Sequence, residues 1–128
     1  GRERVTRWRD GEAEIVAGGN GWGEELSQLC TPTGVCVDGA GVVYVAEFWN
    51  HRVTRWTPGA ACGEVVAGGQ GLGNEAAQLR HPDGVFVLPD GTLYVAEYGN
   101  HRVMRWRPGA TAGELVAGGR GRVEDLGM

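Results

Sequence analysis

Residues 34–53, GVCVDGAGVVYVAEFWNHRV, indicate the architecture more directly than any other part of the chain. Fifty residues later, 84–103 read GVFVLPDGTLYVAEYGNHRV. The likeness continues outward, so that 31–69 and 81–119 align without a gap and are identical at more than half of their positions. Internal repetition with a period of about 20–50 residues is the signature of solenoids, propellers and arrays. Each unit is therefore expected to fold as one supersecondary element.

The N-terminus repeats only the second half of this unit. Residues 4–8, RVTRW, equal 52–56, and residues 14–19, EIVAGG, match 64–69, EVVAGG. The repeats thus divide the chain into half a unit, two complete units and the segments that join them. The predicted boundaries are 1–19 for the half unit (strands three and four), 20–30 for a linker, 31–69 for a complete unit, 70–80 for a linker, 81–119 for a complete unit and 120–128 for the start of a further linker.

Each complete unit is predicted to contain four short β-strands. In the first unit they cover 34–38, 42–47, 52–57 and 64–67, which are rich in Val, Tyr and Trp and are bounded by Gly, Pro and Asp. The polar-apolar stretches 24–29 and 74–79 in the linkers are expected to form a turn of helix.

Four antiparallel strands recurring at this spacing predict the blades of a β-propeller. The fold class is therefore all-β, a partial β-propeller of four-stranded antiparallel blades, with about two and a half blades visible. Both faces of a blade pack on neighbouring blades, which explains the continuous apolar run VVYVA at 42–46, where a solvated sheet would alternate.

The same segments resemble the NHL repeat, which is named for an Asn-His-Leu-like triplet. The resemblance is carried by 34–38, 43–47 and 50–53, and by the linker VAGG at 66–69 with its following Gln78, Leu79 and Pro82. Both copies depart from the usual Asp after Tyr-Val-Ala, because they have Glu47 and Glu97 there. The resemblance implies a ring of about six blades, so the chain is expected to be an excerpt of something longer.

Open blade faces expose apolar surface and unpaired edges. We therefore expect the missing blades to be supplied by the rest of the parent chain or by self-association, and we expect the 128 residues alone to associate in solution.

Composition and charge disfavour several classes of partner. The 128 residues carry a formal net charge of −4, with a pI of about 5.3, whereas proteins that bind RNA or DNA usually present a basic field. No run of about 18 apolar residues predicts a membrane span. The three cysteines, Cys30, Cys36 and Cys62, show no CxxC spacing, which favours free thiols in a reducing, intracellular location over a zinc site or a disulfide framework.

Residues that recur from unit to unit are expected to serve the fold. The triplets Asn50-His51-Arg52 and Asn100-His101-Arg102 are predicted to form the turn between strands two and three, with the Asn at positive φ. One His per unit does not make a metal site. The repeated tryptophans, Trp8, Trp56 and Trp106, are predicted core residues. The repeated arginines are expected to pair with repeated carboxylates, namely Arg52, Arg55, Arg102 and Arg105 with Glu47, Glu97, Glu64 and Glu114.

Residues that differ between the units carry the functional prediction. Trp49 stands where the next unit has Gly99, Trp22 where it has Leu72, and Arg80 where the previous unit has Cys30. The resemblance implies that the linkers and the turns between strands two and three emerge on one face of the ring. The predicted partner-binding residues on that face are Trp22, Trp49, His51, Arg80, His81 and His101. An exposed Trp beside an Arg is typical of interface hot spots.

The resulting hypothesis is a non-catalytic protein-interaction scaffold within a larger chain, by fold-level analogy with NHL propellers that mount protein- or RNA-binding surfaces. An RNA-binding surface is one alternative, which the acidic balance disfavours. The other is a fragment of a six-bladed propeller enzyme, a metal-dependent lyase or lactonase-like hydrolase. Such enzymes need inward ligands at the start of the first strands, where only Asp83 qualifies.

The sequence predicts no catalytic residue, no metal ligand set and no cofactor. The only serine, Ser27, lies in a linker without a GxSxG context. The glycine-rich segment 68–73 lacks the lysine of a P-loop.

Overall fold

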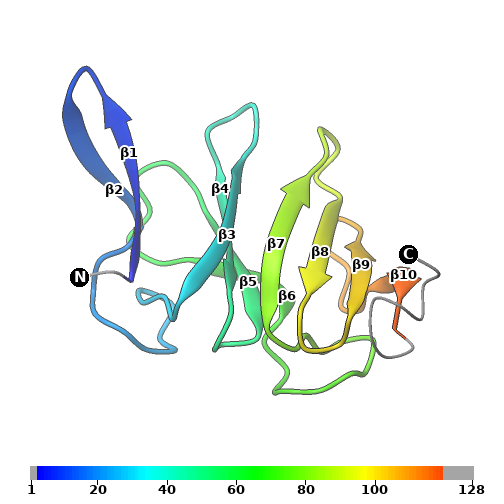
Figure 1. Cartoon of the computed structure of the whole chain (residues 1–128). Coiled ribbons are helices and arrows are strands. Elements are labelled where there is room, and N and C mark those ends of the chain that lie inside the picture. The colour runs from blue at the N-terminus through cyan, green and yellow to red at the C-terminus, as the bar shows by residue number, and fades with distance from the viewer. Residues whose placement is uncertain (1–2, 120–128) are drawn as a thin grey trace.

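A computed structural model describes residues 3–119, which form ten β-strands and no helix (Figure 1). The predicted linker at 120–128 lies outside the described residues. No described helix could cross a membrane. The strands are β1 (Arg4–Arg9), β2 (Glu12–Gly18), β3 (Pro32–Val37), β4 (Val43–Glu47), β5 (Arg52–Trp56), β6 (Glu64–Gly68), β7 (Pro82–Val87), β8 (Leu93–Glu97), β9 (Arg102–Trp106) and β10 (Glu114–Gly118).

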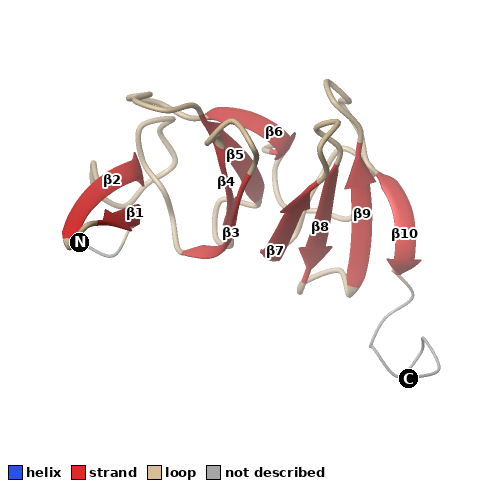
Figure 2. Ribbon diagram, turned by 90° about the horizontal axis from the view of Figure 1, so that it is seen from above, coloured by secondary structure: helices blue, strands red, loops and turns tan. Residues whose placement is uncertain are grey.

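The strands form three separate antiparallel sheets, as the repeat predicts. The two complete sheets have the orders β3-β4-β5-β6 and β7-β8-β9-β10, so each strand pairs with its neighbour in sequence, and β1 pairs with β2 alone. Figure 2 shows the sheets side by side in chain order. The all-β, four-stranded blade prediction is therefore confirmed, with one partial sheet at the N-terminal end.

The first strands of the complete sheets approach each other closely. The Thr33 hydroxyl donates a hydrogen bond to the carbonyl oxygen of Pro82 at 2.9 Å. A Cβ on Gly34 would lie only 3.0 Å from both the Asp83 carbonyl oxygen and the Gly84 Cα, so a larger residue there would require the backbone of β7 to shift. This contact joins the two sheets on the β3–β7 side.

The linkers differ from the prediction, because 24–29 and 74–79 contain a hydrogen-bonded turn instead of a turn of helix. The Gln28 amide N–H donates to the Glu25 carbonyl oxygen at 2.9 Å. The Gln28 side chain then accepts from the Glu25 N–H and donates to the Asn20 carbonyl oxygen. Gln78 repeats the pattern. One glutamine thus satisfies backbone groups that a helix would have paired.

The central strands of the middle sheet, β4 and β5, are buried on both faces, whereas the last sheet is buried on one. All five residues of β4 are buried, but burial alternates along β8. One face of the middle sheet, with Val43, Val45 and Trp56, packs with Ala17 and Leu29. The opposite face packs against the last sheet, and this cluster includes Tyr44, Ala46, Val53, Leu93, Val95, Met104 and Trp106. The continuous apolar run therefore reflects neighbours on both sides.

The repeated tryptophans pack toward the preceding sheet. Trp56 is 1% exposed and Trp106 is 2% exposed, as predicted for core residues. Trp8 is 71% exposed, so its assignment to the core is wrong. The physical reason is that no sheet precedes β1–β2 within residues 3–119, so nothing there covers its outer face.

Candidate functional site

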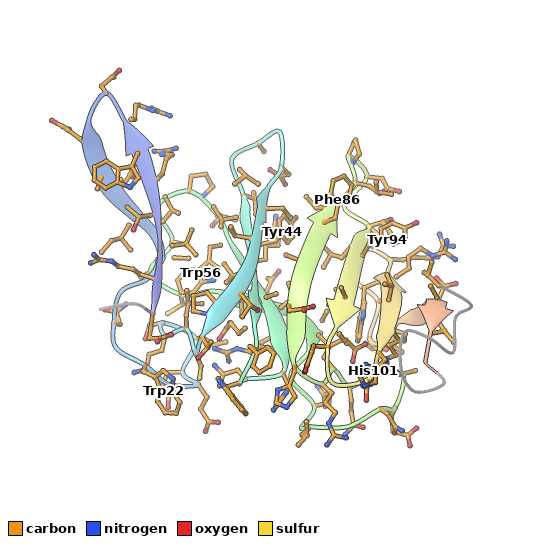
Figure 3. The ribbon with its side chains drawn as sticks, viewed as in Figure 1. Trp22, Tyr44, Trp56, Phe86, Tyr94 and His101 are labelled. Carbon is orange, nitrogen blue, oxygen red and sulfur yellow. The ribbon has the colours of Figure 1, made fainter. Side chains whose placement is uncertain are left out.

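The predicted partner-binding residues all lie along one edge of the sheets, which we call the lower face. It consists of the β4–β5 turn, the β8–β9 turn and the linkers 19–31 and 69–81, at the bottom of Figure 1. Figure 3 shows Trp22 and His101 at this edge, far from Tyr44, Phe86 and Tyr94, which lie higher on the strands. The face is therefore built by loops on a scaffold of strands, which is a common way for folds to carry binding residues.

The backbone of the repeated triplet differs from the prediction. The positive-φ residues are His51 (φ 51°) and His101 (φ 49°), so placing Asn50 and Asn100 in that conformation was wrong. The Asn50 side chain instead donates to Glu47 Oε1 at 2.7 Å and to the Gly23 carbonyl oxygen at 2.9 Å. Its position is thus set by these two acceptors, one of which belongs to the linker.

In each complete sheet, a buried ion pair connects the turn between the second and third strands to the preceding linker. Arg52 Nε donates to Glu47 Oε2 at 3.0 Å, and Glu47 is 0% exposed. The two terminal nitrogens of Arg52 donate to the carbonyl oxygens of Glu24, Glu25 and Gln28. The pair is therefore hydrogen-bonded on both sides, the condition under which a buried charge pair is tolerated.

The second repeat reproduces this arrangement with Glu97, Asn100 and Arg102. In each repeat the glutamate carboxylate accepts from the Asn with one oxygen and from the Arg with the other. Exposed pairs also link Arg55 to Glu64 at 3.7 Å and Arg105 to Glu114 at 3.1 Å. The predicted pairing of repeated arginines with carboxylates is confirmed.

His51 joins the middle sheet to the last one. The His81 backbone N–H donates to His51 Nδ1 at 3.0 Å, and the two rings lie 4.6 Å apart between centroids. Burial, reinforced by His81 and Arg80, lowers the pKa of His51. Between the first sheet and the middle sheet, Glu3 stands at the position that aligns with His51, and its Oε2 accepts from the Thr31 N–H at 2.7 Å.

Sequence reasoning missed this inter-sheet role of the triplet histidine. The available signal was the alignment of Glu3 with His51, because both side chains can accept a hydrogen bond.

Aromatic rings surround His81 on the lower face. The Phe48 ring stacks on the His81 ring at 4.4 Å with an interplanar angle of 20°, and the Trp49 ring meets His81 edge to face at 4.9 Å. Tyr98 extends the cluster, 6.3 Å from Phe48. Trp49 is 54% exposed and Tyr98 is 64% exposed. We call Phe48, Trp49, His81 and Tyr98 the aromatic cluster.

Phe48 and Tyr98 are also residues that the sequence interpretation overlooked. Both repeats have an aromatic residue at this position, so the reasoning that function lies where the repeats differ passed over them.

The structure brings together only part of the predicted set. The His81 ring contacts both Trp49 and His51. Arg80 is close enough to His51 to help lower its pKa, after burial and His81. Trp22 lies apart in the first linker and is 65% exposed. His101 lies beside Tyr98, with ring centroids 6.2 Å apart.

A groove opens next to Trp49 on the lower face, with a volume of about 470 Å³. Its walls come from the first linker, the β4–β5 turn and the end of the middle sheet, and the lining residues include Glu24, Glu25, Trp49, His51 and Val65.

Residues 3–119 bring no group of three or more His, Cys, Asp or Glu side chains together in a way that could hold a metal. Asp83, the candidate ligand of the enzyme alternative, is exposed on β7. The three cysteines are free, and burial raises the pKa of Cys30 and of Cys36, which favours the protonated thiol in both.

Comparison with known families identifies the repeat. Residues 29–56 and 79–105 each match the model of the NHL repeat. Each match begins at a buried linker leucine, Leu29 or Leu79, and ends in the third strand of its sheet. No curated protein matches the chain.

Proposed function

Because the chain is an NHL-repeat protein, with repeats at 29–56 and 79–105, we propose that it is a non-catalytic scaffold segment whose lower face binds another protein. The observation that carries the proposal is the aromatic cluster. Trp49 and Tyr98 are more than half exposed, yet the rings next to them are held by stacking and hydrogen bonds. Exposed aromatic side chains in a fixed arrangement lose little conformational entropy on binding and dominate many interfaces.

The charge around the cluster favours a protein partner over RNA. Arg52 and Arg102, which recur in both repeats, use their guanidinium groups on buried glutamates and linker carbonyls. They are therefore not available to phosphates, which RNA recognition requires. The exposed Glu24 and Glu25 beside Trp49 would repel a phosphate backbone.

The enzyme alternative gains no support from the described residues. Asp83 has no companion ligands among residues 3–119 that could hold a metal with it. The proposal therefore rests on recognition by the aromatic cluster and not on chemistry at a reacting centre.

Substitutions borrowed from the other repeat test the proposal. Trp49→Gly and Trp22→Leu introduce the residues that the next repeat has at these positions, so both variants are expected to fold. Thr57→Ala, in an exposed turn at the opposite edge, is the matched control. Proteins retained by each immobilised variant are quantified side by side, with and without nuclease, and circular dichroism checks the fold.

We expect Trp49→Gly to reduce capture of a discrete protein by at least about tenfold, the size of effect usual for an aromatic hot spot. Trp22→Leu should have a smaller effect because Trp22 lies outside the cluster, and Thr57→Ala should have none. Equal capture by wild type and Trp49→Gly would refute the proposed surface. Loss of all capture on nuclease treatment would establish the RNA alternative instead.

A further inference from the structure

We propose that protonation of His51 regulates this binding surface. It would break the hydrogen bond from the His81 backbone N–H to His51 Nδ1, which we call the junction, and thereby loosen the aromatic cluster. The proposal deepens the proposed function and, where it concerns partner binding, rests on it. The junction itself is a property of the fold that can be tested without a partner.

The hydrogen bond at the junction requires neutral His51. His51 Nδ1 accepts the His81 backbone N–H, so Nδ1 must hold a lone pair and the ring proton must be on Nε2. An imidazolium ion carries a hydrogen on both ring nitrogens and has no acceptor. Protonation of His51 would therefore place two N–H groups against each other where one hydrogen bond had been.

His81 does not share this sensitivity. Its Nδ1 lies 3.3 Å from the carbonyl oxygen of Phe48, which can only accept, so Nδ1 is the donor. A protonated His81 can keep that bond, because its Nδ1 still carries a hydrogen. Protonation of His51 is thus incompatible with the hydrogen bond that its Nδ1 accepts from the His81 N–H.

The charged groups around His51 set when protonation occurs. Burial lowers the pKa of His51 most, and His81 and Arg80, across the junction, act in the same direction. Glu24 and Glu25 of the first linker line the same groove as His51. Arg52, the next residue, is already neutralised by Glu47. The neutral ring is therefore the form favoured at neutral pH, and protonation follows on acidification.

Loss of the junction affects the aromatic cluster through His81. The His81 backbone N–H is fixed by His51, and the His81 ring contacts both Phe48 and Trp49. A His81 freed from its anchor holds these rings less firmly. Because preorganised aromatic rings bind at a lower entropic cost, a loosened cluster binds its partner less tightly.

The chain contains its own control at the preceding junction. There the Glu3 carboxyl accepts from the Thr31 N–H. A carboxyl group retains an acceptor oxygen whether or not it is protonated. The variant His51→Glu therefore copies the first junction into the second, and His51→Gln supplies a neutral acceptor that does not titrate.

Amide hydrogen exchange of the full 128-residue chain measures the junction directly. Exchange of the His81 and Thr31 amides is followed from pH about 7.5 to about 5 and corrected for the intrinsic pH dependence of exchange. In wild type we expect protection of the His81 amide to fall at least about tenfold on acidification, while protection of Thr31 persists. In His51→Gln and His51→Glu, protection of His81 should be constant.

Unchanged protection of the His81 amide in wild type at pH about 5 would overturn the proposal, and so would an equal loss in His51→Gln. Partner binding is then compared at the two pH values, where wild type should weaken on acidification and His51→Gln should not. If the proposed function is wrong, Trp49→Gly will capture as much protein as wild type does. The exchange measurement still tests the hydrogen bond between His51 and His81 in that case, because it requires no partner.

Discussion

On the lower face, the Arg80 side chain fills the space that a side chain at position 99, now Gly99, would need. A Cβ built on Gly99 would collide with Cγ of Arg80 and lie 2.9 Å from its Cδ, and the Gly99 amide donates to the Arg80 carbonyl oxygen at 3.1 Å. The preceding repeat has the reverse arrangement, with a buried Cys30 and an exposed Trp49. At two of the differences singled out for function, the large and the small residue thus change places, because Trp49 accompanies Cys30 in one repeat and Gly99 accompanies Arg80 in the other.

The exchange predicts a strong coupling between the two positions. Gly99→Trp alone should lower the free energy of unfolding by about 1–3 kcal/mol, because the new ring must displace the Arg80 side chain. Gly99→Trp combined with Arg80→Cys should recover most of this loss, since it recreates the pair of the preceding repeat. Urea unfolding of the two single variants and the double variant gives the coupling energy. Additive effects would show that the positions are independent.

The buried ion pair should be far more important to stability than the exposed one in the same sheet. Arg52→Ala leaves Glu47 charged and 0% exposed, so we expect a loss of about 3–5 kcal/mol in the free energy of unfolding. Arg55→Ala removes a pair with Glu64 whose members lie 3.7 Å apart at the surface, which should cost less than about 1 kcal/mol. Similar losses for both variants, measured by urea unfolding, would contradict the assignment.

Stability should depend on pH through His51. Its pKa is lowered in the folded state, mainly by burial and then by His81 and Arg80, so the unfolded chain binds the proton more tightly. The stabilising contribution is complete above the ordinary histidine pKa of about 6.5 and is lost as the pH falls from there toward the folded pKa.

His51→Gln removes this contribution. The difference in unfolding free energy between pH about 7.5 and about 5.5 should therefore be smaller in the variant than in wild type. An identical pH dependence of the two proteins would show that His51 titrates equally in the folded and unfolded states.

The chain should associate in solution. In the last sheet, Phe86 of β7 is 61% exposed, and Leu115 and Val116 of the edge strand β10 are 59% and 48% exposed, while Trp8 is exposed at the other end. Ala117 of β10 is exposed, although its counterpart Ala67 is buried between sheets. Apolar surface of this kind favours contact with another sheet. Sedimentation velocity should show concentration-dependent oligomers, and a monodisperse monomer that unfolds cooperatively would contradict this.

The repeat allowed the sheets to be predicted because it reports what successive units share. Strands that alternate or run continuously apolar between glycine and proline turns are recognisable in one copy, and a second copy removes most of the ambiguity. The Asn and Arg of the triplet were correctly assigned to the fold for this reason, although the conformation of the Asn was not.

Contacts between units could not be predicted in the same way, because a repeat does not show which residues of neighbouring copies meet. The bond between His51 and His81 joins residues from different units, and the burial of a tryptophan depends on the sheet that precedes it. Trp8 was misassigned on this account. The exchange between Arg80 and Gly99 is likewise visible only once the two loops are placed in space.

Site-specific photocrosslinking beside Trp49 tests the proposed binding surface most directly. A benzophenone side chain replaces Glu25, which is exposed and lines the groove next to Trp49, in one variant and Thr57, at the opposite edge, in the other, and both are irradiated in a lysate. The account predicts a discrete protein adduct from position 25, suppressed by added wild-type chain but not by added Trp49→Gly chain, and no such adduct from position 57. No adduct from position 25, or the same adducts from both positions, would contradict it.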